Sequence, residues 1–401
     1  MQIYLVGGAV RDALLGLPVQ DRDWLVVGAT PEQMVAQGFT PVGRDFPVFL
    51  HPQTKEEYAL ARTERKTAPG YQGFAFHAAP EVTLEQDLAR RDLTINSIAA
   101  RAHSESAVGQ FDIKNAELID PFGGLADISA RVLRHTTTAF REDPVRLLRL
   151  ARFAARFTDF SIAPETQALA QAMVQAGEID ALVAERVWQE IARGLMETTP
   201  SRLLHVLHES GALWRLAPEL AYAATAENAA RFKHSLATVD AAAARNAPLP
   251  VRWAGWLVAQ CGLDNSAAKH MEQLCTRWRV PADCRDLALW LAREHTVVQN
   301  AGELDASALV QLLDRSDVWR RPQRFELGLL ASECLAQVAH GAGTMTPTGQ
   351  RLQVALAAAT SVSTASLAQQ AQAQGLAGPA VAQHIQQARI QAVAQRLAEG
   401  N

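Results

Sequence analysis

The sequence predicts an α+β protein in which a small α/β head precedes an all-helical remainder. Residues 1 to about 135 alternate short β-rich runs with turns that contain Gly and Pro, the pattern of an α/β domain. From Asp143 onward strand patterns nearly vanish and long amphipathic stretches replace them. With 401 residues, 48% of them hydrophobic, the chain can bury a full core and divide into two or more domains.

In the head, we expect a strand, a helix and a second strand at the start. Four β-rich runs stand out, at Gln2–Val6, Asp23–Val27, Val48–His51 and Tyr58–Arg62. The first helix is expected over Ala9–Leu15, because Gly16 and Pro18 follow it as helix-ending residues.

The helical part begins with amphipathic stretches at Pro144–Phe157, Pro164–Ala176, Ala184–Met196 and Ser201–Glu209. After about residue 345 the chain is rich in Ala and Gln, and its high helix propensity favours a loosely packed helical tail over disorder. We therefore expect a head over 1–135, a neck over 136–200, a body over 201–345 and a tail over 346–401.

Composition limits the partners less than the motifs do. The net charge of −4 gives no global attraction to nucleic acid, so any RNA must be held by local basic patches. The four cysteines form no Cys-x-x-Cys pair, which argues against a zinc knuckle or a disulfide framework. No apolar run reaches membrane-spanning length and no signal peptide is recognisable, so we expect a cytoplasmic protein without a membrane partner.

The first 23 residues carry the pattern of a nucleotide site. If Asp21 and Asp23 lie on one strand, their side chains share a face, and two adjacent carboxylates repel unless a cation lies between them. Their hard oxygen ligands favour Mg²⁺ bridging to a phosphate. The pair Gly7-Gly8 leaves backbone N–H groups open to phosphate oxygens, and Arg11 can reach a triphosphate.

A second cluster runs from Arg90 to Asn96. Arg90 and Arg91 suit a triphosphate, while Asp92 and Asn96, expected one helical turn apart, could bind ribose hydroxyls. The alternative is a surface helix with an ordinary salt bridge.

A third cluster follows Pro144, which suits the first turn of a helix. Asp143, Arg146 and Arg149 recur every three residues and so share one face. A carboxylate beside a guanidinium can imitate a base edge and accept cytosine and adenine while rejecting uracil and guanine. Taken alone, the pair is better explained as an i,i+3 ion pair.

Together these clusters resemble class II CCA-adding tRNA nucleotidyltransferases of the bacterial multifunctional CCA protein type. The resemblance is dense through about residue 200 and rests on five motifs: Gly7-Gly8-x-x-Arg11-Asp12, Asp21-x-Asp23, Arg90-Arg91-Asp92-x-x-x-Asn96, Asp120-Pro121-x-x-Gly124-x-x-Asp127 and Glu142-Asp143-x-x-Arg146. Gly43–Phe49 and Ala61–Lys66 add to it.

The resemblance implies a polymerase-β-like nucleotidyltransferase head and a role for each motif residue. Asp21 and Asp23 would hold the catalytic Mg²⁺, with Glu57 a possible third carboxylate. The triphosphate would contact Gly8, Arg11 and Arg91. The ribose would be read by Asp92 and Asn96, and the base by Asp143 and Arg146, with Arg149 beside them. Support would come from Gly7, Arg90, Glu142 and Arg186.

The implied reaction is attack of the tRNA 3′-hydroxyl on the α-phosphorus of CTP or ATP, with release of pyrophosphate and no role for DNA. The loop Arg62–Phe74 resembles the element that assists the switch from C to A addition. Glu185–Glu190 resembles a motif that braces the base-selecting helix.

The resemblance weakens in the body, where some relatives carry a His-Asp phosphohydrolase. This chain has no His-Asp dipeptide; His234 remains, but Val258-Ala259 stands where the pair would be expected. We therefore expect no phosphohydrolase activity. Alternatives for the head are a poly(A) polymerase, an enzyme that adds only CC or only A, and an RNA-binding module with an inactive head. The oligomeric state is left open.

Overall fold

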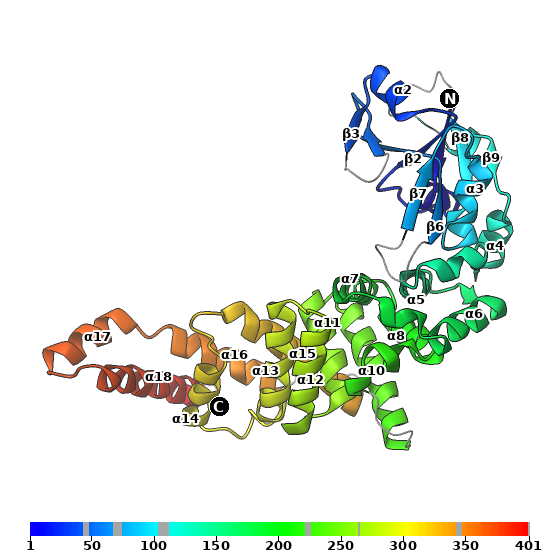
Figure 1. The fold of residues 1–401 in the computed structure, drawn as a ribbon. Helices are drawn as coiled ribbons and strands as arrows, with labels where there is room; N and C mark the ends of the chain where they lie inside the picture. The colour runs from blue at the N-terminus through cyan, green and yellow to red at the C-terminus, as the bar shows by residue number, and fades with distance from the viewer. Residues whose placement is uncertain are drawn as a thin grey trace. The chain divides into compact units, whose positions relative to one another are not determined.

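The computed structural model describes residues 1–42, 48–66, 74–102, 111, 113–220, 226–263, 265–341 and 347–399. It forms two compact units, Met1–Pro218 and Glu219–Asn401 (Figure 1). The first unit combines a sheet with helices and the described part of the second is helical, which confirms the α+β class. The finer division into head, neck, body and tail stays a prediction.

Unit 1 is built on a seven-stranded sheet with the order β3-β4-β5-β2-β1-β8-β9. The strand β1 pairs antiparallel with β2 and with β8, whereas β2 and β5 run parallel. The bounds are β1 Gln2–Val6, β2 Asp23–Val27, β3 Thr40–Val42, β4 Val48–Leu50, β5 Glu57–Leu60, β8 Ala99–Ala102 and β9 Leu118–Ile119. The hairpin β6 Arg62–Lys66 and β7 Phe74–Ala78 and the parallel pair β10 Val132–Leu133 and β11 Ser161–Ile162 are separate.

Two expected strands, β1 and β2, have the predicted bounds. The run predicted at Tyr58–Arg62 instead splits, because the chain leaves the sheet after Leu60 and Arg62 starts the β6 hairpin. Sequence reasoning missed β8, whose Ala-Ala-Arg-Ala has poor strand propensity. Its first two residues, Ala99 and Ala100, are fully buried beside β1, so tertiary packing decides this strand.

The helices of unit 1 follow the predicted periodicity with small shifts at their ends. The expected stretches appear as α1 Gly8–Leu14, α5 Val145–Arg156, α6 Pro164–Gln175, α7 Ala184–Leu195 and α8 Pro200–Glu209. The others are α2 Pro31–Ala36, α3 Leu84–Ala89, α4 Gly124–Ala130 and α9 Ala212–Leu216. The apolar face of α5, with Leu147, Leu148 and Ala151 fully buried, packs against α7 and α8 (Figure 1).

In the described residues of unit 2 every regular element is helical: α10 Ala226–Ala244, α11 Leu249–Cys261, α12 Asn265–Arg277, α13 Ala282–Gln299, α14 Ala306–Arg315, α15 Pro322–His340, α16 Pro347–Thr360, α17 Thr364–Ala373 and α18 Pro379–Glu399. The core lies among α10, α11, α13 and α15, which contact one another (Figure 1). Its largest buried side chains are Trp253, Trp256, Trp278 and Trp290.

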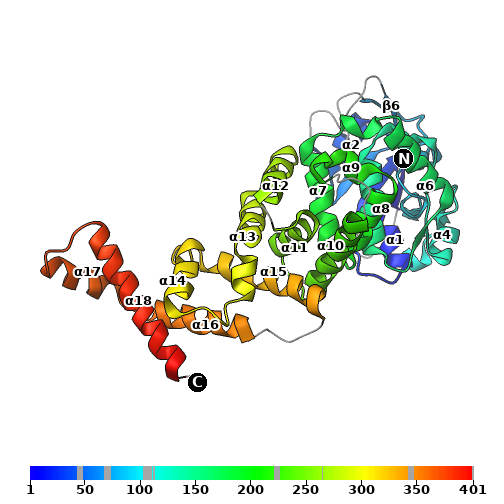
Figure 2. The same ribbon diagram turned by 90° about the horizontal axis from the view of Figure 1, so that it is seen from below.

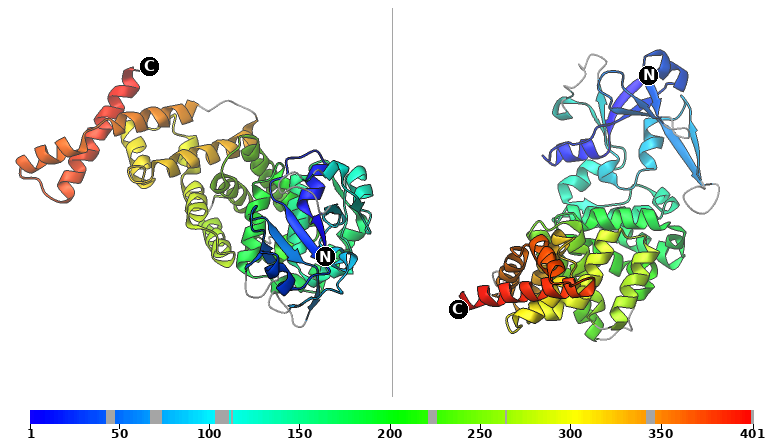
Figure 3. Two further views of the ribbon diagram at one scale, coloured as in Figure 1. Left: turned by 90° about the horizontal axis from the view of Figure 1, so that it is seen from above. Right: turned by 90° about the vertical axis from the view of Figure 1, so that its left-hand side faces the viewer.

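The Ala/Gln-rich tail is helical, as predicted. Within unit 2, α18 contacts α14, α16 and α17 (Figure 2), and the chain reverses between α17 and α18 (Figure 3). Polar contacts supplement the few apolar ones: Gln386 donates to Asp314 at 2.8 Å, and the Arg389 guanidinium lies 3.5 Å from the Trp319 ring centroid. None of the helices in the described ranges is long and apolar enough to span a bilayer.

Candidate active site

An open pocket of about 650 Å³ in unit 1 collects most of the predicted site residues. Nine arginines and five aspartates line it, in a chain whose net charge is −4. This excess of positive charge attracts a polyphosphate. The lining residues are Gly7, Gly8, Ala9, Arg11, Asp12, Gln20, Asp21, Asp23, Arg90, Arg91, Asp92, Asn96, Asp143, Val145, Arg146, Arg149, Arg152, Phe153, Arg156, Arg186 and Arg193.

The predicted metal ligands differ from the other acids of the pocket. Asp23 begins β2, and Asp21 precedes the strand, so the expectation that one strand holds both is wrong; they nevertheless line the same pocket. Among the described residues, neither carboxylate forms an ion pair or a side-chain hydrogen bond, whereas Asp12, Asp92 and Asp143 each bind an arginine. Two neighbouring carboxylates without protein partners fit a divalent cation.

Glu57 lies beside Asp23 in the sheet. The parallel register of β2 and β5 places these two residues opposite each other. Glu57 is exposed and does not line the pocket, so its role as a third ligand stays a prediction.

The Gly7-Gly8 turn brings the backbone against an arginine. Gly7 has a φ of 72°, and a Cβ at this position would lie 3.0 Å from Nη1 of Arg91. The Nε of Arg91 is buried and has no hydrogen-bond partner among the described residues. A larger residue at Gly7 would therefore be strained and would displace this guanidinium.

Arg11 is more enclosed than the sequence suggested, with 3% of its surface exposed. Its Nε and Nη2 lie 2.9 and 2.8 Å from Oδ1 of Asp12, and Nη1 donates to Oδ1 of Asn96 at 2.5 Å. The rings of Phe153 and Phe157 have centroids 5.1 Å from its guanidinium carbon. Burial lowers the pKa of Arg11 although Asp12 opposes this. Most of its donors therefore serve the protein.

The arginine pair is organised by Asp87, to which sequence analysis gave no role. This buried carboxylate lies 2.6 Å from Nη2 of Arg90 and 3.3 Å from Nη2 of Arg91. Burial opposes ionisation, but the charges of Arg90 and Arg91 outweigh it and lower the pKa of Asp87. Arg90 also donates to the Arg62 carbonyl at 3.2 Å, which anchors it to β6. The signal was available, since Asp87 stands three and four residues before the pair.

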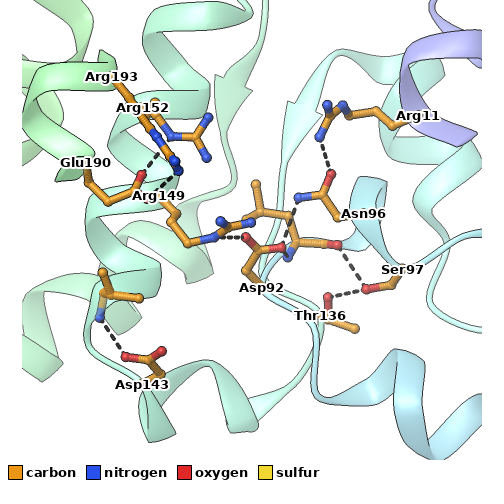
Figure 4. A network of polar contacts seen from close by, with 12 residues as sticks. Arg11, Asp92, Asn96, Ser97, Thr136, Asp143, Arg149, Arg152, Glu190 and Arg193 are labelled. Atoms are coloured by element: carbon orange, nitrogen blue, oxygen red, sulfur yellow. Dashed lines mark hydrogen bonds and ion pairs between the residues drawn. The ribbon is translucent and has the colours of Figure 1, made fainter. Parts of the chain in front are cut away.

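The expectation that Asp92 and Asn96 lie one turn apart on a helix is wrong. The helix α3 ends at Ala89, Leu93 bridges to His135, and a 3₁₀ turn covers Thr94–Asn96. The contact forms nevertheless: Asn96 Nδ2 donates to Oδ1 of Asp92 at 2.9 Å (Figure 4).

The second oxygen of Asp92 accepts from Nε of Arg149 at 2.7 Å. Burial would raise the pKa of Asp92, but Arg149 and the hydrogen bond from Asn96 hold it well below its usual range. This carboxylate is therefore charged and oriented before any nucleotide binds.

The predicted base-reading residues lie at the start of α5. Asp143 precedes the helix, and its two oxygens accept from Nη1 and Nη2 of Arg186 in α7 at 3.0 and 2.8 Å. Arg146 donates to the Ala139 carbonyl at 2.7 Å. Asp143, Arg146 and Arg149 line the pocket, whereas Glu142 ends a 3₁₀ turn and does not.

Sequence analysis gave no site role to several residues of the pocket. Arg152 donates to Glu190 of α7 at 2.7 Å, and Arg156 donates to Asp12 at 2.9 Å. A signal was present, because arginines recur along one face of α5 at three- and four-residue spacing, at positions 146, 149, 152 and 156.

Some predictions fall partly outside the described residues. Within Gly43–Phe49, positions 43–47 are not described, nor are 67–73 of the loop Arg62–Phe74. In unit 2, Val258 and Ala259 are buried in α11, and among the described residues no group of three or more His, Cys, Asp or Glu is arranged to hold a metal. The expected lack of phosphohydrolase activity stays a prediction.

Comparisons with known proteins agree with this geometry. Residues 3–134 match the family model described as the Poly A polymerase head domain, and residues 159–224 match the Probable RNA and SrmB-binding site of polymerase A. The chain is 54% identical to a protein of Polaromonas naphthalenivorans named Multifunctional CCA protein, with 99% of each chain covered. It is 55% identical to the protein of the same name from Verminephrobacter eiseniae, covering 99% of this chain and 100% of that one.

Among solved structures, the chain resembles the Bacillus stearothermophilus CCA-adding enzyme in complex with CTP, with a TM-score of 0.66, 26% identity and 98% and 88% of the two chains covered. Full-length identity above half to the curated relatives shows that this chain belongs to the multifunctional CCA proteins, a family of CCA-adding tRNA nucleotidyltransferases, and its arginine-rich pocket agrees with this.

Proposed function

We propose that the pocket of unit 1 adds and repairs the 3′-terminal CCA of tRNA in the cytoplasm, using CTP and ATP. The tRNA 3′-hydroxyl attacks the α-phosphorus, a P–O bond forms, and pyrophosphate leaves. The observation that carries this is the contrast among the acids of the pocket: no cationic side chain among the described residues pairs with Asp21 or Asp23, although arginines line the same cavity.

Asp21 and Asp23 fit a divalent cation, and their hard oxygen donors favour Mg²⁺. Such an ion, when bound, lowers the pKa of an attacking hydroxyl and neutralises charge on the leaving oxygen. The protein supplies two carboxylates at and just before the start of β2, and an arginine-rich wall that orients the triphosphate.

The residues that line the pocket supply the contacts to the triphosphate. Arg91 lines the pocket beside the Gly7-Gly8 turn and binds the triphosphate together with the backbone of Gly8. Arg11 also binds the triphosphate, through the guanidinium N–H groups that do not contact Asp12 or Asn96.

For the sugar and the base, the oriented carboxylate of Asp92 and the amide of Asn96 read the ribose. Asp143 and Arg146 read the base, while Arg186 fixes the Asp143 carboxylate. Arg90 and Arg149 support these residues through Asp87 and Asp92.

Full-length similarity to Multifunctional CCA proteins favours this function over a poly(A) polymerase, whose head the family model also describes. Incubating the protein with tRNA that lacks its 3′ end and with each labelled NTP separately distinguishes the alternatives. Incorporation of A alone onto any RNA indicates a poly(A) polymerase, and arrest after CC or addition of the last A alone indicates a partial enzyme. No incorporation indicates an RNA-binding module.

Asp21→Ala and Asp23→Ala should each abolish addition of both C and A while leaving tRNA binding within about twofold, since these carboxylates act on the reaction and not on the tRNA. Glu32→Ala, an exposed acid on α2, serves as the control and should be fully active. Extension of tRNA by an Asp21/Asp23 double variant would refute the metal assignment.

A further inference from the structure

A closed chain of hydrogen bonds begins and ends on α5. Arg156 Nη2 donates to Oδ2 of Asp12 at 2.9 Å, and Oδ1 of Asp12 accepts from Nε of Arg11 at 2.9 Å. Arg11 donates to Asn96, Asn96 donates to Asp92, and Asp92 accepts from Arg149 at 2.7 Å (Figure 4). Because Arg149 and Arg156 lie two helical turns apart on the same face of α5, we call this chain the α5 circuit.

The α5 circuit fixes the direction of each amide and carboxylate within it. A guanidinium only donates, so the Asn96 oxygen must face Arg11 and its NH₂ must face Asp92. One oxygen of Asp92 then accepts from Asn96 and from the Leu93 N–H at 2.9 Å, and the other accepts from Arg149. A lone pair of the second oxygen remains to accept from a sugar hydroxyl.

Arg156 holds the far end of this chain. Asp12 has a side chain that is 10% exposed, and that of Arg156 is 31% exposed, so their ion pair is partly shielded from solvent. The Arg156 guanidinium also stacks over Phe157, 5.2 Å from the ring centroid, and the same ring contacts Arg11. These contacts limit the positions that Asp12 and Arg11 can take.

We propose that Arg156 is a positioning residue that sets sugar selectivity by orienting Asp92 through Asp12, Arg11 and Asn96. Arg146, one of the two residues proposed to read the base, lies near the other end of the same helix, and Asp143 just precedes it. This inference rests on the proposed role of Asp92 as the ribose reader.

The test compares kcat/KM for CTP and 2′-deoxy-CTP in the full chain. Arg156→Met should lower the preference for CTP about tenfold, because it frees the second oxygen of Asp12 and leaves Arg11, Asn96 and therefore Asp92 less tightly oriented. Arg156→Lys should recover part of that preference, since an ammonium can still reach Asp12. Arg11 and Asp12 remain paired in both variants, so the fold should persist, and thermal unfolding verifies this.

Arg141→Met is the matched control, because Arg141 forms an ion pair with Glu178 at 2.7 Å in unit 1 but does not line the pocket. It should leave the CTP preference unchanged. A double variant of Arg156→Met with Asn96→Ala should lose no more preference than Asn96→Ala alone, since both act through Asp92.

Two outcomes separate failure of this inference from failure of the proposed function. If Arg156→Met raises KM equally for CTP and 2′-deoxy-CTP with an unchanged preference, Arg156 binds phosphate and the inference is wrong. If Asp92→Ala itself leaves the preference for CTP over 2′-deoxy-CTP intact, Asp92 does not read the ribose. The proposed sugar site is then wrong, whatever Arg156 does. An unstable Arg156→Met is replaced by Arg156→Gln with the same readout.

Discussion

The two units differ in the balance of charged and aromatic side chains that they bury, although unit 2 also buries Arg252 and Glu294. Unit 1 buries charge: Arg11, Asp12, Asp87, Asp92 and Arg146 are each less than 9% exposed, and four of the five line one pocket. Unit 2 buries four tryptophans, which its helices enclose. Buried charges cost desolvation energy that aromatic packing does not, so unit 1 retains them where a charged ligand must be oriented.

Substitution of Gly328 tests the aromatic core of unit 2, and we expect it to cause the largest loss of stability among the variants. A Cβ here would lie 2.1 Å from the Trp290 ring, so Gly328→Ala should destabilise unit 2 by about 3 kcal/mol. Denaturant unfolding measures this. Single-nucleotide addition should keep its KM for CTP in the folded fraction, because the pocket lies in unit 1. A KM for CTP that rises together with the loss of stability would show that the pocket of unit 1 depends on the core of unit 2.

Gly124 is the matched glycine of unit 1, and its substitution should affect catalysis as well as stability. A Cβ there would lie 2.3 Å from the Thr94 carbonyl oxygen, in the turn that carries Asn96. Gly124→Ala should therefore shift this turn and lower kcat/KM for CTP about 100-fold. Steady-state kinetics measures it, and activity close to that of the parent protein would contradict the role of this turn.

Arg186 tests whether the charges of unit 1 select the base. Arg186→Met removes both donors that orient Asp143 and should raise incorporation of UTP relative to CTP about tenfold. Arg193→Met, on the same helix and the same pocket, is the control and should affect UTP and CTP alike. Equal effects in both variants would show that Asp143 needs no fixed orientation.

Lowering the pH should separate the stabilities of the two units, and this is the smallest effect that we expect. Burial, with His340 and His234 nearby, lowers the pKa of His295 in unit 2 to about 4. An unfolded histidine titrates at about 6.5, so burial of neutral His295 favours folded unit 2 above that pH, and this contribution is lost as the pH falls toward 4. The pKa values of Asp87 and Asp92 are lowered, so their charged carboxylates stabilise unit 1 above about pH 4. This contribution is lost only as the pH falls below that value.

Thermal unfolding of the full chain between pH 7 and pH 4 checks this order. His295→Asn should remove the decline in the stability of unit 2 between about pH 6.5 and pH 4, whereas substitution of His205, an exposed histidine of unit 1, by Asn should leave that decline unchanged. Parallel loss of both transitions in that range would show that another group controls the acid sensitivity.

Much of the fold was predictable from local patterns. Gln2–Val6 and Asp23–Val27 have the predicted bounds, and each long amphipathic stretch became a helix, because periodic apolar residues define the buried face. The strand Ala99–Ala102 was not predictable, since its small residues are buried by neighbouring strands and not by their own propensity.

For the site, the sequence by itself determined which chemical groups are present: paired acids, a glycine turn and three arginine-bearing clusters whose types suit a nucleotide. Only the tertiary structure decided how these groups are paired. Asp143 binds Arg186 from a distant helix, and Asp92 meets Asn96 through a turn and not a helix. Such pairings depend on distances between segments far apart in the chain, which burial and packing set and local spacing does not contain.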